Sequence, residues 1–323
     1  MKAAILSEYG SDLEVVEVNR PDLPDDSVMI EVHAASINPI DWIVMAGHVQ
    51  AMLPYELPWI VGYDVSGVVV DVGPGAQGFA VGDEVFARAD GMQAATMAEY
   101  SAVKASDLAI KPSNISHAEA AGIPLAGLTA WQALFDKGGL QAGHRVLIHA
   151  GSGGVGTLAI QIAKHAGAWV AATASAKNKD LVESLGADQF IDYSNERFEE
   201  VIEKFDVVFD MLGDETLKRS FDAVKPGGTI VSIKGDAPDG LAAERSVAFH
   251  SFFMEPDGEQ LAEIAALITA GTIRPVLDRT FPLDEVAAAY DYARSGSANG
   301  KVAIAVRSPR SDQAEASGPT IRT

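Results

Sequence analysis

The stretch RVLIHAGSGGVGTLAIQIAKHAGAWVAAT, from Arg145 to Thr173, decides the fold of this chain. A short apolar run, Val146 to Ala150, opens it, and a second apolar run, Trp169 to Ala172, closes it. Three glycines follow the first run at G-x-G-x-x-G spacing, and they are Gly151, Gly153 and Gly156. Apolar residues at helical spacing fill the interval. The pattern predicts a strand, a tight glycine turn, a helix and a second strand.

This glycine turn has the residue types that a bound pyrophosphate requires. The first glycine permits the turn, the second lets backbone N–H groups approach the phosphates, and the third lets helix and strand pack closely. The N-terminus of the following helix carries partial positive charge. Alone the motif has little specificity, but its place between a strand and a helix favours a dinucleotide site. A glycine-rich turn without a ligand is the alternative.

The residues after the second strand favour NADPH over NADH. An NAD site usually has an Asp or Glu about 20 residues into the motif, which accepts a hydrogen bond from the ribose 2′-OH. Here the chain reads TASAKNK from Thr173 to Lys179, and the first acid is Asp180. Ser175 can donate a hydrogen bond to a 2′-phosphate and Lys177 can neutralise it. A solvated surface lysine is the alternative for Lys177.

Length and charge limit the classes of protein. A chain of 323 residues suits two domains. Lys and Arg number 24 against 45 Asp and Glu, a formal charge of −21, which disfavours nucleic acid and anionic membrane surfaces as partners. The absence of cysteine excludes disulfides and any zinc site that depends on thiolates.

The sequence shows no targeting or membrane signal. The first residues, MKAAILSEYG, have one lysine and too short an apolar run for a signal peptide, and there is no window of 18 apolar residues. We therefore expect a cytoplasmic protein with no membrane contact.

Short β-branched runs bounded by Gly, Pro, Asn or Asp predict a β-rich, barrel-like module from Met1 to about Ser106. The expected strands are Lys2–Leu6, Leu13–Val18, Val28–Ala35, Val65–Val72, Glu84–Ala87 and Ala98–Val103. At the other end of the chain, a predicted helix, Leu283–Ala293, and a predicted strand, Lys301–Val306, resemble this module in composition. The last 16 residues, from Ser308, are polar and without periodicity, which predicts a disordered tail.

Between these parts the period becomes helical, from His117 to about Asp136, and strands and helices then alternate. The expected elements after the glycine turn are helices at Lys177–Leu185, Arg197–Glu203, Glu215–Val224 and Glu259–Ala270, and strands at Gln189–Ile191, Asp206–Met211 and Gly228–Lys234. Such alternation predicts a parallel sheet with helices on both faces.

Several ordered motifs carry a resemblance to a known family. They are Asn38-Pro39-Ile40-Asp41, Gly62-Tyr63-Asp64-Val65-Ser66-Gly67, Gly82-Asp83-Glu84-Val85, Ala126-Gly127-Leu128-Thr129-Ala130, the glycine turn, Lys225-Pro226-Gly227-Gly228 and Gly300-Lys301-Val302. With these motifs the chain is similar to the medium-chain dehydrogenase/reductase superfamily, and within it to the zinc-free quinone oxidoreductase branch of zeta-crystallin-like NADPH:quinone reductases and enone reductases.

The resemblance implies an α/β fold with a GroES-like β-barrel module and a Rossmann doubly wound parallel sheet. The expected division is 1–125 for the GroES-like catalytic domain, with 275–307 returning to it, 126–274 for the NADPH-binding domain, and 308–323 for the tail. Zinc-dependent relatives have a His-Glu pair where this chain has Tyr63-Asp64, and their structural lobe does not fit between Phe86 and Tyr100. The seven histidines show no metal spacing, so we expect no bound metal.

The resemblance also assigns candidate residues. Those near the nicotinamide and the substrate are Asn38, Asp41, Tyr63, Asp64 and Thr129. The cofactor set is Gly151, Ser152, Gly153, Gly154, Val155, Gly156, Thr173, Ser175, Lys177, Tyr193, Leu212, Ile233 and Lys301. Four candidates of the first set have a stated alternative: Asn38 as a turn residue, Asp64 as a capping or structural carboxylate, Thr129 as a helix N-cap, and Tyr63 as an aromatic wall instead of a donor to a substrate oxygen.

The leading functional hypothesis is an NADPH-dependent reductase of quinones or α,β-unsaturated carbonyls. An enoyl-thioester reductase and a non-enzymatic NADPH-binding sensor are the alternatives, and the resemblance implies a homodimer. A tyrosine that lines the pocket in several quinone reductases corresponds to about Val49, so substrate preference does not transfer. The segments Val49–Trp59 and Phe249–Met254 are expected to form an apolar pocket, with core packing as the alternative.

Overall fold

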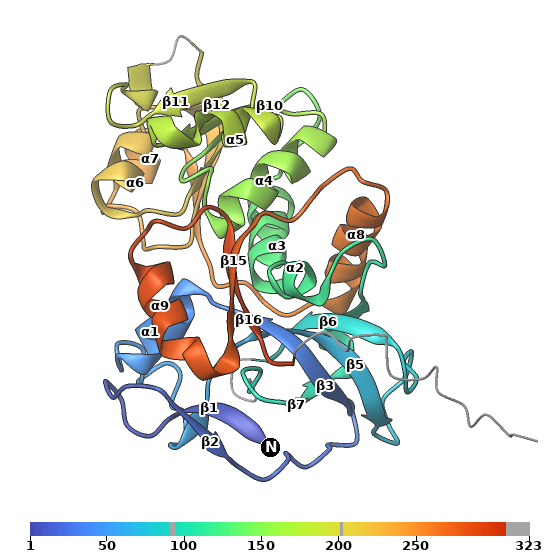
Figure 1. The fold of residues 1–323 in the computed structure, drawn as a ribbon. Helices are drawn as coiled ribbons and strands as arrows, with labels where there is room; N and C mark the ends of the chain where they lie inside the picture. The colour runs from blue at the N-terminus through green and yellow to red at the C-terminus, as the bar shows by residue number, and fades with distance from the viewer. Residues whose placement is uncertain (91–94, 201–202, 308–323) are drawn as a thin grey trace, which may run out of the picture.

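The computed structural model describes residues 1–90, 95–200 and 203–307, so the predicted tail, 308–323, lies outside the described residues. Figure 1 shows two lobes, a β-rich one that contains the first strands and a second one built on a parallel sheet. The chain enters the second lobe through α2 (His117–Ala121) and α3 (Pro124–Trp131) and leaves it after α8 (Gly258–Thr269). Its last strands then return to the first lobe.

The first lobe contains a seven-stranded sheet in the order β15-β16-β3-β5-β6-β8, with β7 also paired to β3. Its strands are β3 (Ser27–Ser36), β5 (Asp64–Val72), β6 (Glu84–Arg88), β7 (Tyr100–Lys104), β8 (Leu108–Ile110), β15 (Leu277–Pro282) and β16 (Lys301–Ala305). A smaller sheet has the order β2-β1-β4, from Glu14–Glu17, Lys2–Leu6 and Trp59–Ile60. Helices α1 (Pro39–Met45) and α9 (Val286–Arg294) complete the lobe. Valine and isoleucine side chains of β3, β5, β6 and β16 fill one core between the sheets.

The second lobe is a six-stranded parallel sheet in the order β11-β10-β9-β12-β13-β14. The strands are β9 (Arg145–Ile148), β10 (Trp169–Ala174), β11 (Gln189–Asp192), β12 (Phe205–Asp210), β13 (Val224–Ser232) and β14 (Ala248–Ser251). Numbered from β9, this is the order 3-2-1-4-5-6 of the Rossmann fold. The predicted fold class is therefore confirmed.

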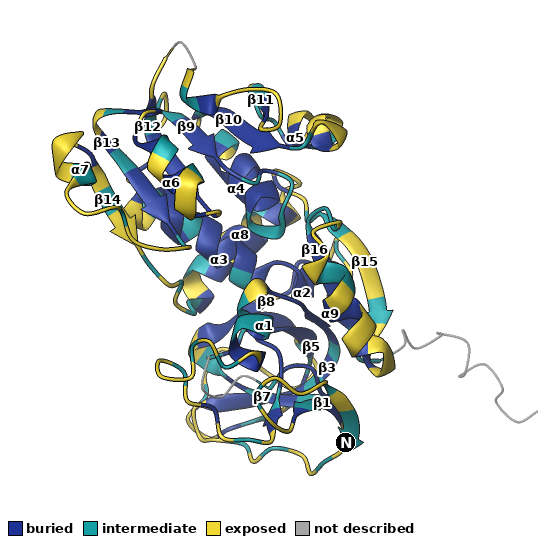
Figure 2. Ribbon diagram, turned by 90° about the vertical axis from the view of Figure 1, so that its left-hand side faces the viewer, coloured by how far each residue is buried: buried dark blue, intermediate teal, exposed yellow. Residues whose placement is uncertain are grey.

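Alternation along the central strands explains how both faces of this sheet are covered. Val146 and Ile148 of β9 join the cluster with α3, α4 (Gly154–His165), α5 (Lys179–Ser184) and α8, whereas Leu147 joins the cluster with α6 (Asp214–Ser220) and α7 (Leu241–Glu244). Because side chains alternate between the faces of a strand, a continuous apolar run serves both clusters. Figure 2 shows the buried central strands, with α7 and the edge strand β14 more exposed.

Three sequence predictions of helices differ from the structure. The helix expected over 117–136 is divided into α2, α3 and a π-helical turn, Gln132–Lys137, because Pro124 has no N–H to continue a helix and instead begins α3. The helix expected over 197–203 is a 3₁₀ turn, Phe198–Glu200, within the described residues, and 201–202 lie outside them. The helix expected over 215–224 ends at Ser220, and β13 begins at Val224. Strands β4, β8, β14 and β15 are too short or too polar to have been predicted.

Candidate active site

The glycine turn adopts the predicted geometry between β9 and α4. A Cβ atom added to Gly156 would lie 2.3 Å from the Ala150 carbonyl oxygen, so only glycine permits this approach of helix to strand. A Cβ on Gly153 would meet only that oxygen within 4 Å, at 3.3 Å, so the space beside it is open in the described structure. Gly153 precedes α4, whose first N–H groups have no intrahelical acceptor. The turn therefore fits the pyrophosphate of a dinucleotide.

The other predicted cofactor residues follow the carboxyl ends of neighbouring strands. Ser175 and Lys177 follow β10, Tyr193 follows β11, Leu212 follows β12 and Ile233 follows β13. Lys177, Tyr193 and Leu212 are exposed, and the Tyr193 N–H donates to the Ala174 carbonyl oxygen at 3.4 Å. The strand order reverses between the neighbouring strands β9 and β12, because the chain runs from β9 to β11 on one side and then crosses to β12 on the other. The structure thus brings these residues to one edge of the sheet, at the point where open α/β sheets bind ligands.

A buried histidine that sequence reasoning did not assign fixes the end of β9. The Ser220 hydroxyl donates to the Thr216 carbonyl oxygen at 2.8 Å, so it accepts from His149 Nε2 at 3.0 Å. His149 Nδ1 then accepts from the Thr173 hydroxyl at 3.2 Å. Burial, with a smaller effect of Arg219, lowers the pKa of His149 to about 3, so the ring is neutral. Thr173 therefore supports the turn through its side chain, and the lone histidine in an apolar strand was the available signal.

The candidates Asn38 and Asp64 meet in a buried hydrogen-bond network in the barrel lobe. Asp64 Oδ2 accepts from Asn38 Nδ2 and from the Ser36 hydroxyl, both at 2.8 Å. Asp64 Oδ1 accepts from the Leu125 N–H, also at 2.8 Å, at the start of α3. Lys301 Nζ donates to Asn38 Oδ1 at 2.5 Å. All four side chains are buried, and the network joins α1, β5, α3 and β16.

Asp41 lies next to this network with one carboxyl oxygen unpaired. Its Oδ2 accepts from the Asn38 N–H at 2.8 Å and from the Tyr290 hydroxyl at 3.1 Å, whereas Oδ1 is buried without a hydrogen-bond partner in the described structure. Burial is the main cause that raises the pKa of Asp41 to about 7, with Asp64 adding to the rise and Lys301 opposing it. Sequence reasoning missed Tyr290, which comes from α9, almost 250 residues away.

Tyr63 is fully buried, and its hydroxyl is already occupied. It forms a 2.7 Å hydrogen bond with the Tyr55 hydroxyl, and burial raises the pKa of both phenols. Tyr55 stacks on Trp59 at a centroid distance of 4.2 Å. This part of the segment Val49–Trp59 therefore packs in the core of the barrel lobe, whereas Met52 is 61% exposed.

Thr129 lies in the interior of α3 and not at its start, so the N-cap alternative is wrong. Its hydroxyl donates to the Leu125 carbonyl oxygen at 2.6 Å. Because Leu125 also donates to Asp64, Thr129 stands one helical turn from the buried network. The segment Phe249–Met254 is mixed: Phe249, Phe252 and Met254 pack against the cores and Phe253 is 65% exposed.

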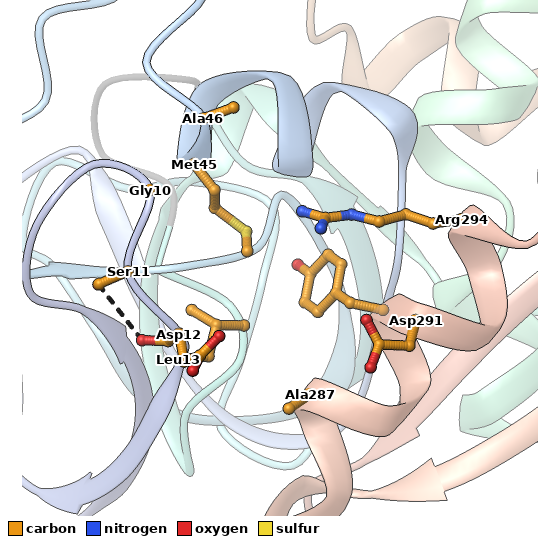
Figure 3. A pocket seen from close by; sticks show the side chains of 10 residues that line it. Gly10, Ser11, Asp12, Leu13, Met45, Ala46, Ala287, Asp291 and Arg294 are labelled. Carbon is orange, nitrogen blue, oxygen red and sulfur yellow. Dashed lines mark hydrogen bonds between the residues drawn. The ribbon is translucent and has the colours of Figure 1, made fainter.

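A cavity of about 260 Å³ lies elsewhere, on the side of the barrel lobe (Figure 3). It is bounded by the loop Gly10–Leu13, the end of α1 and the face of α9 that carries Asp291 and Arg294. Tyr290 is part of its wall, so the partner of Asp41 separates this cavity from the buried network.

Comparison with known proteins gives matches over both lobes. Residues 24–113 match the alcohol dehydrogenase GroES-like domain family, and residues 185–304 match the zinc-binding dehydrogenase family. A 2-methylene-furan-3-one reductase of Solanum lycopersicum is 40% identical over 318 residues, which cover 94% of this chain and 79% of the relative. The chain belongs to the medium-chain dehydrogenase/reductase superfamily. The predicted family is therefore confirmed.

Other members of the medium-chain dehydrogenase/reductase superfamily are similar over the same extent. An NADPH-dependent alkenal/one oxidoreductase, chloroplastic, of Arabidopsis thaliana is 39% identical and covers 94% of this chain and 79% of the relative. The solved structure of the quinone oxidoreductase from Coxiella burnetii has a TM-score of 0.87 and 33% identity, and covers 95% of this chain and 99% of that one.

Zinc, which one family description mentions, does not fit this site. Both oxygens of Asp64 accept hydrogen bonds within the network, and the Tyr63 hydroxyl bonds Tyr55. Over 1–90, 95–200 and 203–307, no three His, Asp or Glu side chains are grouped to hold a metal ion, and the sequence has no cysteine.

In the same ranges, no helix is long and apolar enough to cross a bilayer.

Proposed function

We propose that this chain is an NADPH-dependent oxidoreductase that transfers hydride to a quinone or an α,β-unsaturated carbonyl compound. The observation that carries the proposal is the carboxyl edge of the parallel sheet. There the glycine turn offers N–H donors to a pyrophosphate, and β10 is followed by Ser175 and Lys177 where an NAD site would have a carboxylate. The names of the alkenal/one reductase and the quinone oxidoreductase among its relatives support the same chemistry.

NADPH supplies the hydride, and the protein binds, orients and excludes water. A conjugated acceptor suits the donor set of this chain, because the negative charge moves onto a carbonyl oxygen that one proton donor can neutralise. A simple ketone needs stronger polarisation, and the Tyr63-Asp64 position offers no metal-ligating pair for it.

We propose that the buried network forms the support of the nicotinamide site. In this proposal Asn38 and Thr129 border the nicotinamide, and Asp41, Tyr63 and Asp64 hold the surrounding wall. Their burial and their hydrogen bonds to one another support a positioning role better than direct contact with solvent or with a mobile substrate. The apolar segments Val49–Trp59 and Phe249–Met254 remain proposed pocket elements.

We extend the proposal to domains, assembly and location. The division 1–125 with 275–307, against 126–274, is supported by the pairing of β16 with β3. A homodimer through the second lobe is supported by β14, which lies at the end of the parallel sheet and pairs with β13 on one side. Light scattering of the pure protein tests the dimer, because a monomeric mass contradicts it. We also propose a cytoplasmic location for this chain, whereas the name of one relative describes that protein as chloroplastic.

The test is turnover with a panel of acceptors. The pure protein is mixed with NADPH and 1,4-benzoquinone, 9,10-phenanthrenequinone, an enone, a 2-alkenal or a crotonyl thioester, and loss of the reduced-nicotinamide absorbance is followed. Turnover of a quinone, the enone or the alkenal supports the proposal. Preference for the thioester would favour an enoyl-thioester reductase, and NADPH binding without any turnover would favour a sensor.

A further inference from the structure

The residue before strand β16, Gly300, contacts the glycine turn of the other lobe. Strand β16 itself belongs to the barrel sheet (Figure 1). The Gly300 N–H donates to the Ser152 carbonyl oxygen at 2.8 Å, and Gly300 forms an isolated parallel bridge with Gly153. Gly300 has φ +74°, and a Cβ there would lie 2.1 Å from the Val276 carbonyl oxygen. Position 300 therefore requires glycine, and this contact fixes where Lys301 leaves the backbone.

The side chain of Lys301 then passes between two further glycines. A Cβ on Gly154, the first residue of α4, would lie 2.6 Å from Lys301 Cδ. A Cβ on Gly122, at the end of α2, would lie 3.3 Å from Lys301 Cβ. The lysine stem thus packs directly against the turn that receives the pyrophosphate.

The Lys301 ammonium group ends inside the buried network of the barrel lobe. It donates to the Ile37 carbonyl oxygen at 2.8 Å and to Asn38 Oδ1 at 2.5 Å, and it lies 3.5 Å from Asp64 Oδ2. Burial lowers the pKa of Lys301, whereas Asp64 and Asp41 act in the opposite direction. Its three N–H donors are therefore directed at the network and away from the turn.

These contacts also fix the orientation of the Asn38 amide. An ammonium group only donates, so it must face Asn38 Oδ1, and this leaves Nδ2 to donate to Asp64 Oδ2. Without Lys301, Asn38 Oδ1 loses this donor, and Asp64 alone still distinguishes the two ends of the amide.

We propose that Lys301 is a positioning residue that holds the glycine turn in register with the barrel wall at Asn38 and Asp64. It does so without touching the cofactor, in contrast to the direct contact expected from the sequence. With this register, the glycine turn that binds the pyrophosphate and the barrel wall that borders the nicotinamide are held at one fixed distance from each other. The inference rests on the proposed function only in that the dinucleotide is NADPH.

The test compares NADPH with 2′,5′-ADP, which keeps the adenosine phosphates and lacks the nicotinamide half. Calorimetry gives the two dissociation constants for the wild type and for Lys301→Met, a substitution of similar length. For Lys301→Met we expect nearly unchanged affinity for 2′,5′-ADP. We expect the ratio of the 2′,5′-ADP dissociation constant to the NADPH dissociation constant to fall about tenfold, the size of one charge-assisted hydrogen bond.

Lys111→Met is the matched control. Lys111 is also buried, and its Nζ donates to two carbonyl oxygens, of Pro112 and Ile115, and lies 3.2 Å from the Glu84 carboxylate. This substitution removes a comparable buried charge outside the network, so we expect it to affect stability without changing the ratio of the two dissociation constants. If Lys301→Met does not fold, Lys301→Met with Asp64→Asn removes both charges and is expected to show the same lost ratio.

A double-mutant cycle tests whether Lys301 acts through Asn38. In an Asn38→Ala background, Lys301→Met should reduce NADPH affinity less than twofold further. A full tenfold further loss, an unchanged ratio in Lys301→Met, or an equal loss in Lys111→Met overturns the inference. Absence of acceptor turnover in a wild type that binds NADPH would reject the proposed activity, while the ratio would still decide the role of Lys301. A wild type that does not bind NADPH would overturn both.

Discussion

Asp41→Asn tests the electrostatics of the buried network directly. Asp41 is fully buried, and burial raises its pKa from 3.8 to about 7, against the opposing effects of the Asn38 N–H, Lys301 and Tyr290. Between these two pKa values the folded protein binds more protons than the unfolded chain. The contribution of Asp41 to stability is therefore present below about pH 4 and is lost as pH rises towards and through 7.

The magnitude follows from the size of the shift. One pKa unit corresponds to about 1.4 kcal/mol, so the full loss is about 4 kcal/mol, and about 2 kcal/mol of it falls between pH 5.5 and 8.5. Asparagine does not ionise, and its amide oxygen can accept from the Asn38 N–H and the Tyr290 hydroxyl in place of Oδ2. We expect Asp41→Asn to gain about 2 kcal/mol of unfolding free energy relative to the wild type over this interval.

Urea unfolding followed by tryptophan fluorescence at both pH values measures this difference. Trp42 and Trp59 report on the barrel lobe, in which Asp41 is buried. Asp236→Asn, which changes an exposed carboxylate, is the control and should show little pH-dependent difference. If the difference between Asp41→Asn and the wild type is the same at pH 5.5 and 8.5, the assigned pKa of Asp41 is wrong.

Three further predictions address the nucleotide-binding lobe. Lys177→Ala should weaken NADPH binding more than NADH binding, and equal effects in a fluorescence titration would remove its assigned role at the 2′-phosphate. Gly156→Ala should lower the free energy of unfolding by about 1–3 kcal/mol or more, because its Cβ would lie 2.3 Å from a backbone oxygen. Gly153→Ala should fold normally and lose NADPH affinity. An equal loss of stability in the two variants would contradict the geometry assigned to the turn. His149→Asn should lower the free energy of unfolding by about 1 kcal/mol less at pH 5.5 than at pH 7.5. The reason is that the folded pKa of about 3 makes the wild type lose stability as pH falls below 6.5. A pH-independent effect in urea unfolding would show that the ring is not held neutral.

The nucleotide-binding lobe could be predicted from sequence because its signals are local. The glycine turn, the strand before it and the helix after it lie within 29 consecutive residues, Arg145 to Thr173, and the structure reproduces their order. The prediction of one helical stretch over 117–136 missed the division at Pro124, although the signal was local, since proline favours the first turn of a new helix. The edge strand β14 has only four residues and no clear alternation, so nothing in its sequence distinguished it from a loop.

The buried network was only partly readable because its contacts are distant in sequence. Asn38 and Asp64 could be selected from their motifs, but their contacts with Leu125 and Lys301 depend on the packing of separate elements. Tyr290 carried no motif, and its hydrogen bond to Asp41 spans 249 positions. Burial was the second property that the sequence did not predict. The phenol of Tyr63, a candidate donor by residue type, is fully buried and forms a hydrogen bond with Tyr55.

The pairing of β16 with β3 has a consequence for the order in which the chain acquires structure. The nucleotide-binding sheet is contiguous, from β9 to β14, and can assemble while synthesis continues, as domains generally do. The barrel sheet instead lacks two of its seven strands until residues 277–305 have left the ribosome. During that interval the Ala34–Ser36 end of β3 lacks its partner β16, while β7 can already pair with Ser27–Glu31. It is at this end of β3 that a nascent chain of this protein is most exposed to mispairing with a neighbour.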